Sequence, residues 1–293
     1  MTLLRSINNR LHNYMAVPAI VLFAVFFLYP LARGIGVSLT DSNGMTAPHF
    51  VGLQNFFDFF QDDRAKQDVR NTVLFALGSA PLLNLFGFLY ALLMDRPFRG
   101  KAAVRTLVYM PAVISPLIMG YIWYFILQPE RGFLFRMLKP LHGGLGDMDW
   151  LGGSNSALIV LIAVNVWQYV GMTMIVYLAG LQSIPSELYE ASRIDGAGYM
   201  KTLRYVTIPM LYPSVKINVV TNIIGSLSVF DIIVALTDGG PGYSTESLSL
   251  YIMRQLYGSQ TGYSTAVAVI LFVIIIIPVA VYLRFMKTRE FEM

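Results

Sequence analysis

The 293-residue sequence contains no cysteine, and this absence excludes a disulfide framework, a thiolate zinc site and an iron–sulfur cluster. The three histidines, His12, His49 and His142, are too scattered to indicate a histidine metal site, so we expect no bound metal. Charged residues are also scarce, at 13% against about 25% in ordinary soluble domains. Hydrophobic residues make up 56%, and the mean hydropathy is +0.59. This composition is typical of a membrane protein.

Motifs for catalysis are missing as well. A phosphate-binding loop of the form G-x-x-x-x-G-K-[ST] is absent, because Gly100 and Lys101 are followed by Ala102 and lack the first glycine. The chain therefore cannot obtain energy by hydrolysing ATP itself. A membrane enzyme would need acids, bases or metal ligands clustered inside the apolar stretches, and the sequence has none there. We expect no catalytic residue and no cofactor bound by this chain.

Six apolar stretches have about the 20 residues that a helix needs to cross a bilayer. They are 15–33, 72–94, 105–127, 157–180, 212–236 and 266–286. The first follows two arginines, as in a signal peptide, but its long apolar run and the lack of a small-residue cleavage site favour an uncleaved span. The shorter stretch 248–256 predicts an amphipathic helix outside the core. We therefore expect an all-α, polytopic fold with six transmembrane helices, forming one domain over 1–293.

The distribution of basic residues predicts the orientation of these spans. With the N-terminus inside, 12 of the 21 Lys and Arg residues lie in inner segments and 8 in outer ones, with Lys216 inside the fifth span. Because basic residues concentrate on the cytoplasmic side, both termini are expected in the cytoplasm. The pI of about 9.2 then reflects membrane topology, so we expect no nucleic-acid partner.

A polar hairpin over about 186–209 separates the fourth and fifth stretches, and this topology places it on the cytoplasmic side. Ser186 can cap a short helix with Glu187 and Glu190 in its first turn, where the helix dipole favours acids. Asp195 and Gly196 break that helix, and a second short helix ends at Pro209. The hairpin is either a plain interfacial connection or a docking element for a cytoplasmic partner.

The sequence of this hairpin carries a family resemblance. The run "YLAGLQSIPSELYEASRIDGAGYMKTLRYVTIPML" resembles the EAA motif of permeases of binding-protein-dependent ABC importers, with Ser192 where the motif usually has Ala. Three further segments, 52–56, 98–123 and 229–252, match the carbohydrate-uptake branch that includes the maltose-system permeases. Four motifs in the expected order identify the chain as similar to a permease of an ABC sugar importer.

The resemblance implies the type I ABC importer permease fold in the bacterial cytoplasmic membrane. It implies a second homologous permease subunit, two copies of a cytoplasmic ATPase that holds ATP and Mg, an extracytoplasmic solute-binding protein and a carbohydrate substrate. The hairpin would be the coupling element that docks on the ATPase. The residues that this implies for coupling are Glu190, Ala191, Ser192, Asp195, Gly196, Ile208 and Pro209.

Two polar stripes at helical spacing predict where the solute passes. The fourth span carries Asn165, Gln168, Tyr169 and Met172, and the fifth carries Asn222, Ser226 and Val229 among others. Uncharged amides and hydroxyls suit a neutral polyhydroxylated solute, because amides both donate and accept hydrogen bonds. Hydrogen bonding between neighbouring helices is the alternative interpretation. The resemblance favours the pathway, since spans four and five supply substrate contacts in the maltose-type permeases.

Other functions stay open at this point. Asp231 lies about 180° around a continuous helix from Asn222, so we expect a structural or gate role for it. An ion-coupled secondary carrier would need buried carboxylates and internal repeats, which the sequence does not show. A permease of the same family for glycerol phosphate or another small solute remains an alternative, although an anion would favour basic residues in the cavity.

Overall fold

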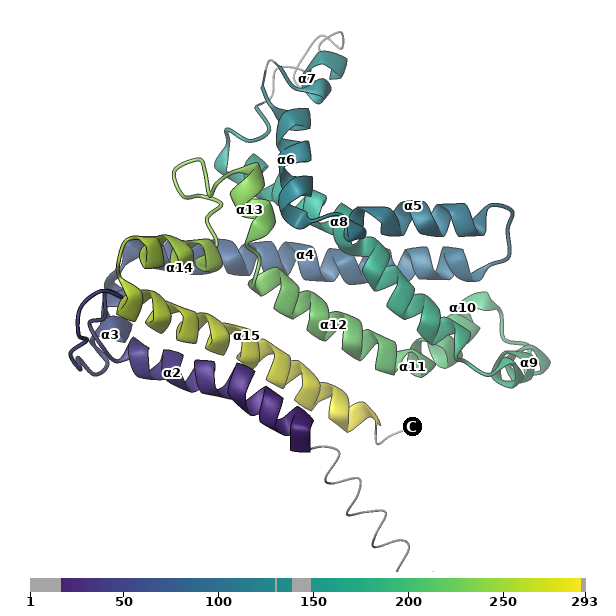
Figure 1. Ribbon diagram of the computed structural model, residues 1–293. Helices are drawn as coiled ribbons and strands as arrows, with labels where there is room; N and C mark the ends of the chain where they lie inside the picture. Colours follow the sequence, from purple (N-terminus) through teal and green to yellow (C-terminus); the bar gives the residue numbers. More distant parts are fainter. Residues whose placement is uncertain (1–16, 130, 139–148, 291–293) are drawn as a thin grey trace, which may run out of the picture. The chain divides into compact units, whose positions relative to one another are not determined.

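The computed structural model describes residues 17–129, 131–138 and 149–290, and most of them are helical (Figure 1). Within these residues the only extended pairing is an isolated bridge between Thr40 and Phe50. The all-α fold is therefore confirmed. The chain divides into two compact units, one made of Met1–Asp62 and Ile252–Ile270, the other of Asp63–Tyr251 and Leu271–Met293. The single domain over 1–293 stays a prediction.

The smaller unit begins with a long apolar helix that runs from Val17 to Ser38. It contains a π-helical turn, η1 (Ala24–Leu28), and ends as α2 (Tyr29–Ser38). Most of its large apolar side chains are exposed, as expected for a helix that faces lipid. Residues 15 and 16 of the first expected span lie outside the described residues.

A polar loop follows α2 and is held by a few specific bonds. Asn55 of α3 (Gln54–Gln61) donates through Nδ2 to the carbonyls of Ser38 and Thr40 at 2.8 and 2.9 Å. The backbone N–H of His49 donates to Asp41 Oδ1 at 2.6 Å, which lowers the pKa of that carboxyl group. The turn of the loop is thus tied across its base.

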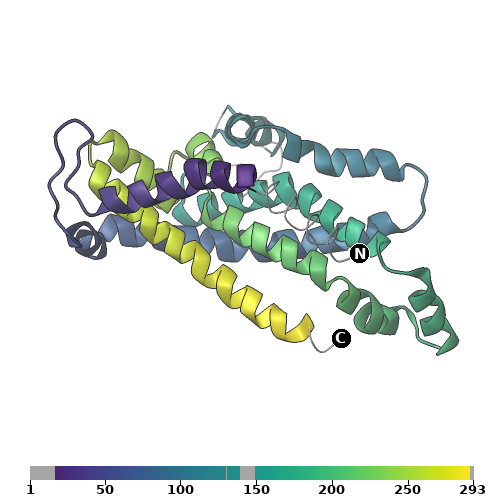
Figure 2. The same ribbon diagram turned by 60° about the horizontal axis from the view of Figure 1, so that its bottom comes forward.

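The larger unit is built around α4 (Asp63–Asp95) and α8 (Ser154–Gln182), which pack along each other (Figure 2). Helices α12 (Tyr212–Leu227) and α5 (Lys101–Val113) pack on this pair. Small residues permit the close approach, because a side chain at Gly171 of α8 would lie only 2.7 Å from the Cα atom of Tyr109 in α5.

The third expected span, 105–127, is not a straight helix. Helix α5 ends at Val113, α6 (Pro116–Leu127) follows, and the two are bent by 99°. The cause is local: Pro116 disfavours helical geometry in the residue before it, and Ser115 has φ −52° and ψ 132°.

The fifth expected span, 212–236, is also interrupted. Helix α12 ends at Leu227, and α13 (Asp231–Leu236) starts after an irregular connection in which Phe230 has φ −142° and ψ −66°. The hydroxyl of Ser247 donates to the Val229 carbonyl at 2.8 Å and so satisfies a backbone group that the break sets free. In the described part of the chain, four helices are long and apolar enough to cross a membrane, or five with the bent pair.

The loop 237–247 is fixed to the start of α4 by a partly buried ion pair. Arg64 Nε and Nη2 donate to the two carboxylate oxygens of Glu246 at 2.8 and 2.9 Å, and the Glu246 side chain is fully buried. The Arg64 guanidinium also lies 3.7 Å from the ring centre of Tyr243. The amphipathic stretch predicted at 248–256 is helix α14 (Leu248–Tyr257), whose buried side chains include Leu248 and Tyr251.

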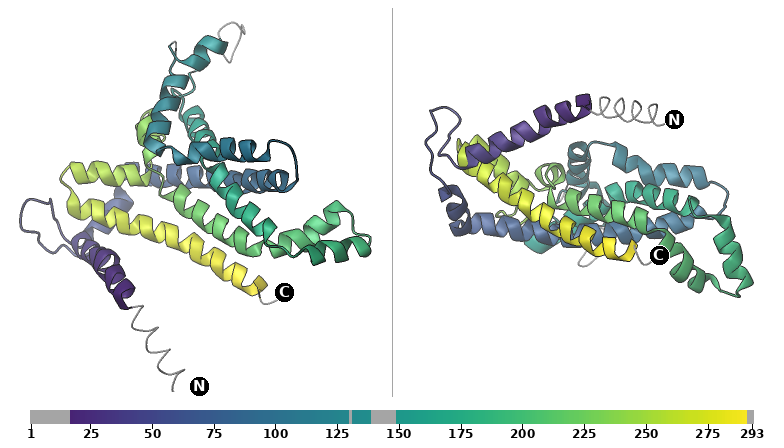
Figure 3. Two further views of the ribbon diagram at one scale, coloured as in Figure 1. Left: turned by 45° about the vertical axis from the view of Figure 1, so that its right-hand side comes forward. Right: turned by 90° about the horizontal axis from the view of Figure 1, so that it is seen from below.

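Helix α15 (Thr261–Glu290) includes the sixth expected span, 266–286. The other helices not yet named are short. Helix α7 (Phe133–Leu138) follows α6, and α9 (Ser186–Ile194), α10 (Tyr199–Thr202), the π-helical turn η2 (Leu203–Thr207) and α11 (Ile208–Met210) connect α8 to α12. The last four form the hairpin predicted at about 186–209, and the views agree that it extends beyond the ends of α8 and α12 (Figure 3).

Candidate solute pathway and coupling hairpin

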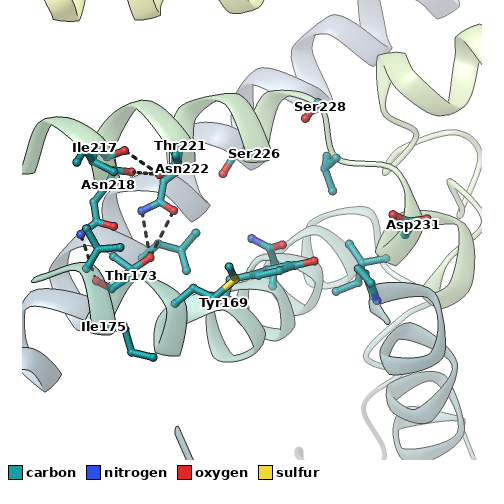
Figure 4. Close-up of a pocket in the computed structure, with 18 of the residues that line it drawn as sticks. Tyr169, Thr173, Ile175, Ile217, Asn218, Thr221, Asn222, Ser226, Ser228 and Asp231 are labelled. Carbon is teal, nitrogen blue, oxygen red and sulfur yellow. Dashed lines mark hydrogen bonds between the residues drawn. The ribbon is translucent and has the colours of Figure 1, made fainter. Parts of the chain in front are cut away.

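A cavity of about 580 Å³ lies between α8 and α12 in the larger unit (Figure 4). Its walls come mainly from these two helices, from the connection 228–230 and from the first residues of α13. Leu83 of α4, Tyr109 of α5 and Pro116 of α6 complete the lining. The cavity thus combines apolar surface with amide, hydroxyl, phenol and carboxyl groups, a mixture typical of small-molecule sites.

Most residues of the two predicted polar stripes line this cavity. From α8 these are Asn165, Tyr169 and Met172; from α12 and its end they are Asn222, Ser226 and Val229. Asn165 and Ser226 are buried, at 6% and 2% exposure, whereas Met172 is 49% exposed. The helical spacing thus indicated which residues of α8 and α12 line one cavity. Contact of these residues with a solute stays a prediction.

Gln168, the remaining member of the stripes, is fully buried and is not part of the lining. Its Nε2 donates to the carbonyl of Ile114 at 3.1 Å. Ile114 lies at the bend between α5 and α6, where the helical hydrogen-bond pattern is interrupted. In this structure the amide of Gln168 supports the bend of the third span.

A small polar network joins α8 to α12 on one side of the cavity. Asn222 Nδ2 lies 3.3 Å from the hydroxyl of Thr173, and Asn218 Nδ2 donates to the Thr173 carbonyl at 3.1 Å. Figure 4 shows these contacts clustered around Thr173. Interhelical hydrogen bonding, the alternative for the stripes, thus applies to Asn218 and to part of Asn222. Thr173 itself was not predicted, although it lies four residues after Tyr169 on the same helix face.

Asp231 also lines the cavity, so the prediction that it lies opposite Asn222 on one helix was wrong. A continuous helix would place it there, but the chain breaks at 228–230 and α13 starts in a new direction at Asp231. Asp231 is exposed, and Figure 4 shows it on the cavity wall with Tyr169 on the facing helix α8.

The turn of the hairpin has the geometry that the Asp-Gly pair predicts. Gly196 has φ +72°, a left-handed conformation that side chains other than glycine rarely adopt. The N–H of Gly196 donates to the Arg193 carbonyl at 3.0 Å, and that of Ala197 to the Ser192 carbonyl at 2.9 Å. This pair of bonds is a Schellman motif, which ends α9 sharply.

Two features at the ends of the hairpin differ from expectation. Ser186 does not cap α9, because it is already the first helical residue and Pro185 precedes it without a side-chain cap. Pro209 does not end a helix, since it lies inside α11 directly after the π-helical turn η2. A widened π turn accommodates proline, whose ring would collide with the carbonyl four residues earlier in a regular helix.

The hairpin is joined to the helix bundle through its inner side. Ser192 is buried, and its hydroxyl bonds to the Tyr189 carbonyl at 2.9 Å and to the Thr202 hydroxyl at 3.2 Å, linking α9 to α10. The Tyr189 ring packs against a buried cluster that includes Leu178 of α8 and Leu211 at the start of α12. The extra hydroxyl at Ser192, where the EAA motif usually has Ala, therefore joins the two arms.

The outer side of the hairpin combines charge with exposed apolar groups. Glu190, Ala191, Asp195 and Gly196 are exposed. Large apolar side chains are exposed beside them, with Ile194 at 86% and others as follows: Leu188, Tyr199, Met200, Tyr205 and Ile208. Exposed apolar groups gathered on a polar element are typical of an interaction surface.

Comparisons with known proteins agree on one family. Residues 84–289 match the family described as "Binding-protein-dependent transport system inner membrane component". The chain is 32% identical over 281 residues to a probable permease for starch degradation products of Thermoanaerobacterium thermosulfurigenes, covering 94% of both chains. It is 32% identical to an sn-glycerol-3-phosphate permease of Agrobacterium fabrum, covering 96% of both. A solved bacterial ABC transporter that imports the acidic polysaccharide alginate matches with a TM-score of 0.81 at 26% identity, covering 98% of this chain and 99% of that one.

Proposed function

The chain belongs to the inner membrane components of binding-protein-dependent transport systems, and from that membership we propose that it forms half of the membrane pathway of an ATP-driven sugar importer. As a permease subunit it is not an enzyme and has no cofactor of its own, and a separate ATPase supplies the energy. It works in the membrane with an extracytoplasmic solute-binding protein. The partners that we propose beyond this are a second homologous permease and two copies of a cytoplasmic ATPase with ATP and Mg.

One connection in the chain supports the mechanism most strongly. The hairpin joins the end of α8 to the start of α12, and these two helices form the main walls of the cavity. Any displacement of the hairpin therefore acts on both walls at once, without an intervening linker. We propose that ATP-driven closure of the ATPases moves the docked hairpin and thereby opens the cavity outward to receive solute. Hydrolysis then returns the cavity to its inward-facing state.

The residues proposed for coupling have different tasks. Glu190 is the ionic contact to the ATPase, with Ala191 and Asp195 beside it on the exposed side. Gly196 sets the turn, and Ser192 joins the two arms. Ile208 and Pro209 lie where the second arm enters the bundle. This arrangement requires the hairpin, and both termini, to lie in the cytoplasm, as the distribution of basic residues predicts.

Solute uptake by the reconstituted transporter tests the proposed importer function. The complete complex in proteoliposomes, with ATP inside and the cognate binding protein outside, is given labelled maltose, trehalose, sn-glycerol 3-phosphate or alginate oligosaccharide. We expect uptake of a neutral sugar that needs both ATP and the binding protein and that a protonophore leaves unchanged. Uptake that survives loss of the ATPase and collapses with the protonophore would instead identify an ion-coupled carrier. Uptake of glycerol phosphate alone would favour the second candidate, a permease for that anion.

A further inference from the structure

Among the described residues that line the cavity, Asp231 is the one carboxylic acid, and none is Lys or Arg. Its side chain is exposed although it lies in a stretch hydrophobic enough to be expected within the membrane. An acid at such a position is costly against lipid, so it should face a hydrated cavity. The break at 228–230 provides that orientation, because it turns the start of α13 toward the cavity.

Ser226 is a further polar residue of the lining, and its hydroxyl lacks a hydrogen-bond partner within the described part of the chain. The hydroxyl oxygen of Ser226 is buried without a hydrogen bond, and Ser226 as a whole is 2% exposed. Buried hydroxyls are usually satisfied, so an unsatisfied one in a cavity wall indicates that a ligand or water completes it. Figure 4 shows Ser226 and Asp231 on the wall formed by α12 and α13, with Tyr169 on the facing helix α8.

These groups favour one class of solute over another. A carboxylate only accepts hydrogen bonds, and it can accept two at once from neighbouring hydroxyls or from an amine. An acidic sugar or a phosphate ester would bring a like charge to the same wall, with no basic side chain among the described lining residues to offset it. The amides and hydroxyls alone would not make this distinction.

We propose that Asp231 determines the charge selectivity of the cavity, so that it admits neutral or cationic hydroxylated solutes and repels anions. This inference rests on the proposed function and narrows its substrate class. Asp231 would bind solute hydroxyl or amino groups directly, and Ser226 and Tyr169 would contribute hydrogen bonds from the same cavity.

Charged thiol reagents test this charge without knowledge of the natural solute. The chain has no native cysteine, so Ser228→Cys introduces a unique reporter in it. Ser228 lines the cavity and is exposed, and its hydroxyl donates to the Ile224 carbonyl of α12. The assembled transporter in proteoliposomes is treated with a cationic trimethylammonium-ethyl or an anionic sulfonatoethyl methanethiosulfonate. The modification rate of this chain is followed by mass spectrometry.

We expect the ratio of cationic to anionic rates to fall by about tenfold when Asp231→Asn is added, the size expected for removing one unit charge in a partly hydrated site. Asp238→Asn is the matched control: it removes an acid that is not part of the lining, and it should leave the ratio nearly unchanged. Comparing the ratio of cationic to anionic rates with and without Asp231→Asn cancels the difference in intrinsic reactivity between the two reagents.

Two other outcomes overturn the inference in distinguishable ways. If Ser228→Cys is modified but the ratio does not depend on Asp231, the charge role is wrong, and the importer function stands on its own uptake test. If Ser228→Cys is modified by neither reagent in any nucleotide state, the cavity is not open to solvent. That result removes both the inference and the proposed pathway.

Discussion

Two glycines in the hairpin are open to solvent but differ in backbone conformation. Gly196 has φ +72°, whereas Gly198 has φ −73°, and a side chain at either would meet no atom within 4 Å. We therefore expect Gly196→Val to cost about 1–3 kcal/mol through backbone strain and to reduce ATPase binding, while Gly198→Val is tolerated. Thermal unfolding of the purified complex and ATPase co-purification measure both effects. Equal behaviour of the two variants would show that the turn conformation is unimportant.

The role of Gln168 can be tested by substitution, because a residue that contacts solute and a residue that supports the bend between α5 and α6 predict different results. Gln168→Leu keeps a similar side-chain volume but removes the donor to the Ile114 carbonyl, and losing such a bond costs about 1–3 kcal/mol. We expect a melting temperature lower by a few degrees, with an unchanged KM for solute uptake. Met172→Leu on the same helix is the control, since Met172 is exposed to the cavity. A raised KM without loss of stability would restore Gln168 to the solute pathway.

At the scale of helices, one close contact between α5 and α8 should be sensitive to a single carbon atom. A Cβ atom at Gly171 would lie 2.7 Å from the Cα atom of Tyr109, and neither backbone can move without disturbing the bundle. We expect Gly171→Ala to destabilise the complex by about 1–3 kcal/mol. Gly225→Ala in α12 is the matched control, because its Cβ would meet nothing within 4 Å. Thermal unfolding in detergent compares them, and an equal loss at both positions would contradict the predicted close contact.

The apolar stretches of the sequence indicated where helices lie but not where they break. Hydropathy sums over a window, so 105–127 and 212–236 each read as one span although each contains a break. Pro116 was a usable signal for the first break, since a proline restricts the residue before it. The second break depends on Ser247, which supports the Val229 carbonyl from 18 residues away, and no local pattern contains that contact.

The same limit explains the outcome for the candidate site. Residues on one uninterrupted helix, such as Asn165 and Tyr169 or Asn222 and Ser226, were assigned to the correct face by their spacing. Asp231 was misplaced because it lies beyond the break. The Gly196 turn was predictable because the Asp-Gly pair acts locally, whereas the tie between Ser192 and Thr202 spans two arms and was not.

At the scale of the whole molecule, the account depends on the continuity between hairpin and cavity. Tyr189 is partly buried and packs against the cluster that includes Leu178 of α8 and Leu211 at the start of α12, which joins the hairpin to both helices. A rigid joint of this kind transmits displacement, whereas a flexible one would absorb it. The family relation identifies a separate ATPase as the source of motion. The structure shows which two helices, α8 and α12, that motion would shift.

The most direct test follows opening of the cavity while contact at the hairpin is varied. Ser228→Cys is modified with the cationic reagent, with and without ATP and vanadate, in the complete complex carrying either Glu190→Ala or the control Glu187→Ala. Removing one partner of a buried ion pair costs about 2–5 kcal/mol, so Glu190→Ala should weaken ATPase binding at least tenfold. We predict a nucleotide-dependent change in modification rate that Glu187→Ala retains and Glu190→Ala loses. A full nucleotide response together with normal ATPase binding in Glu190→Ala would contradict the account.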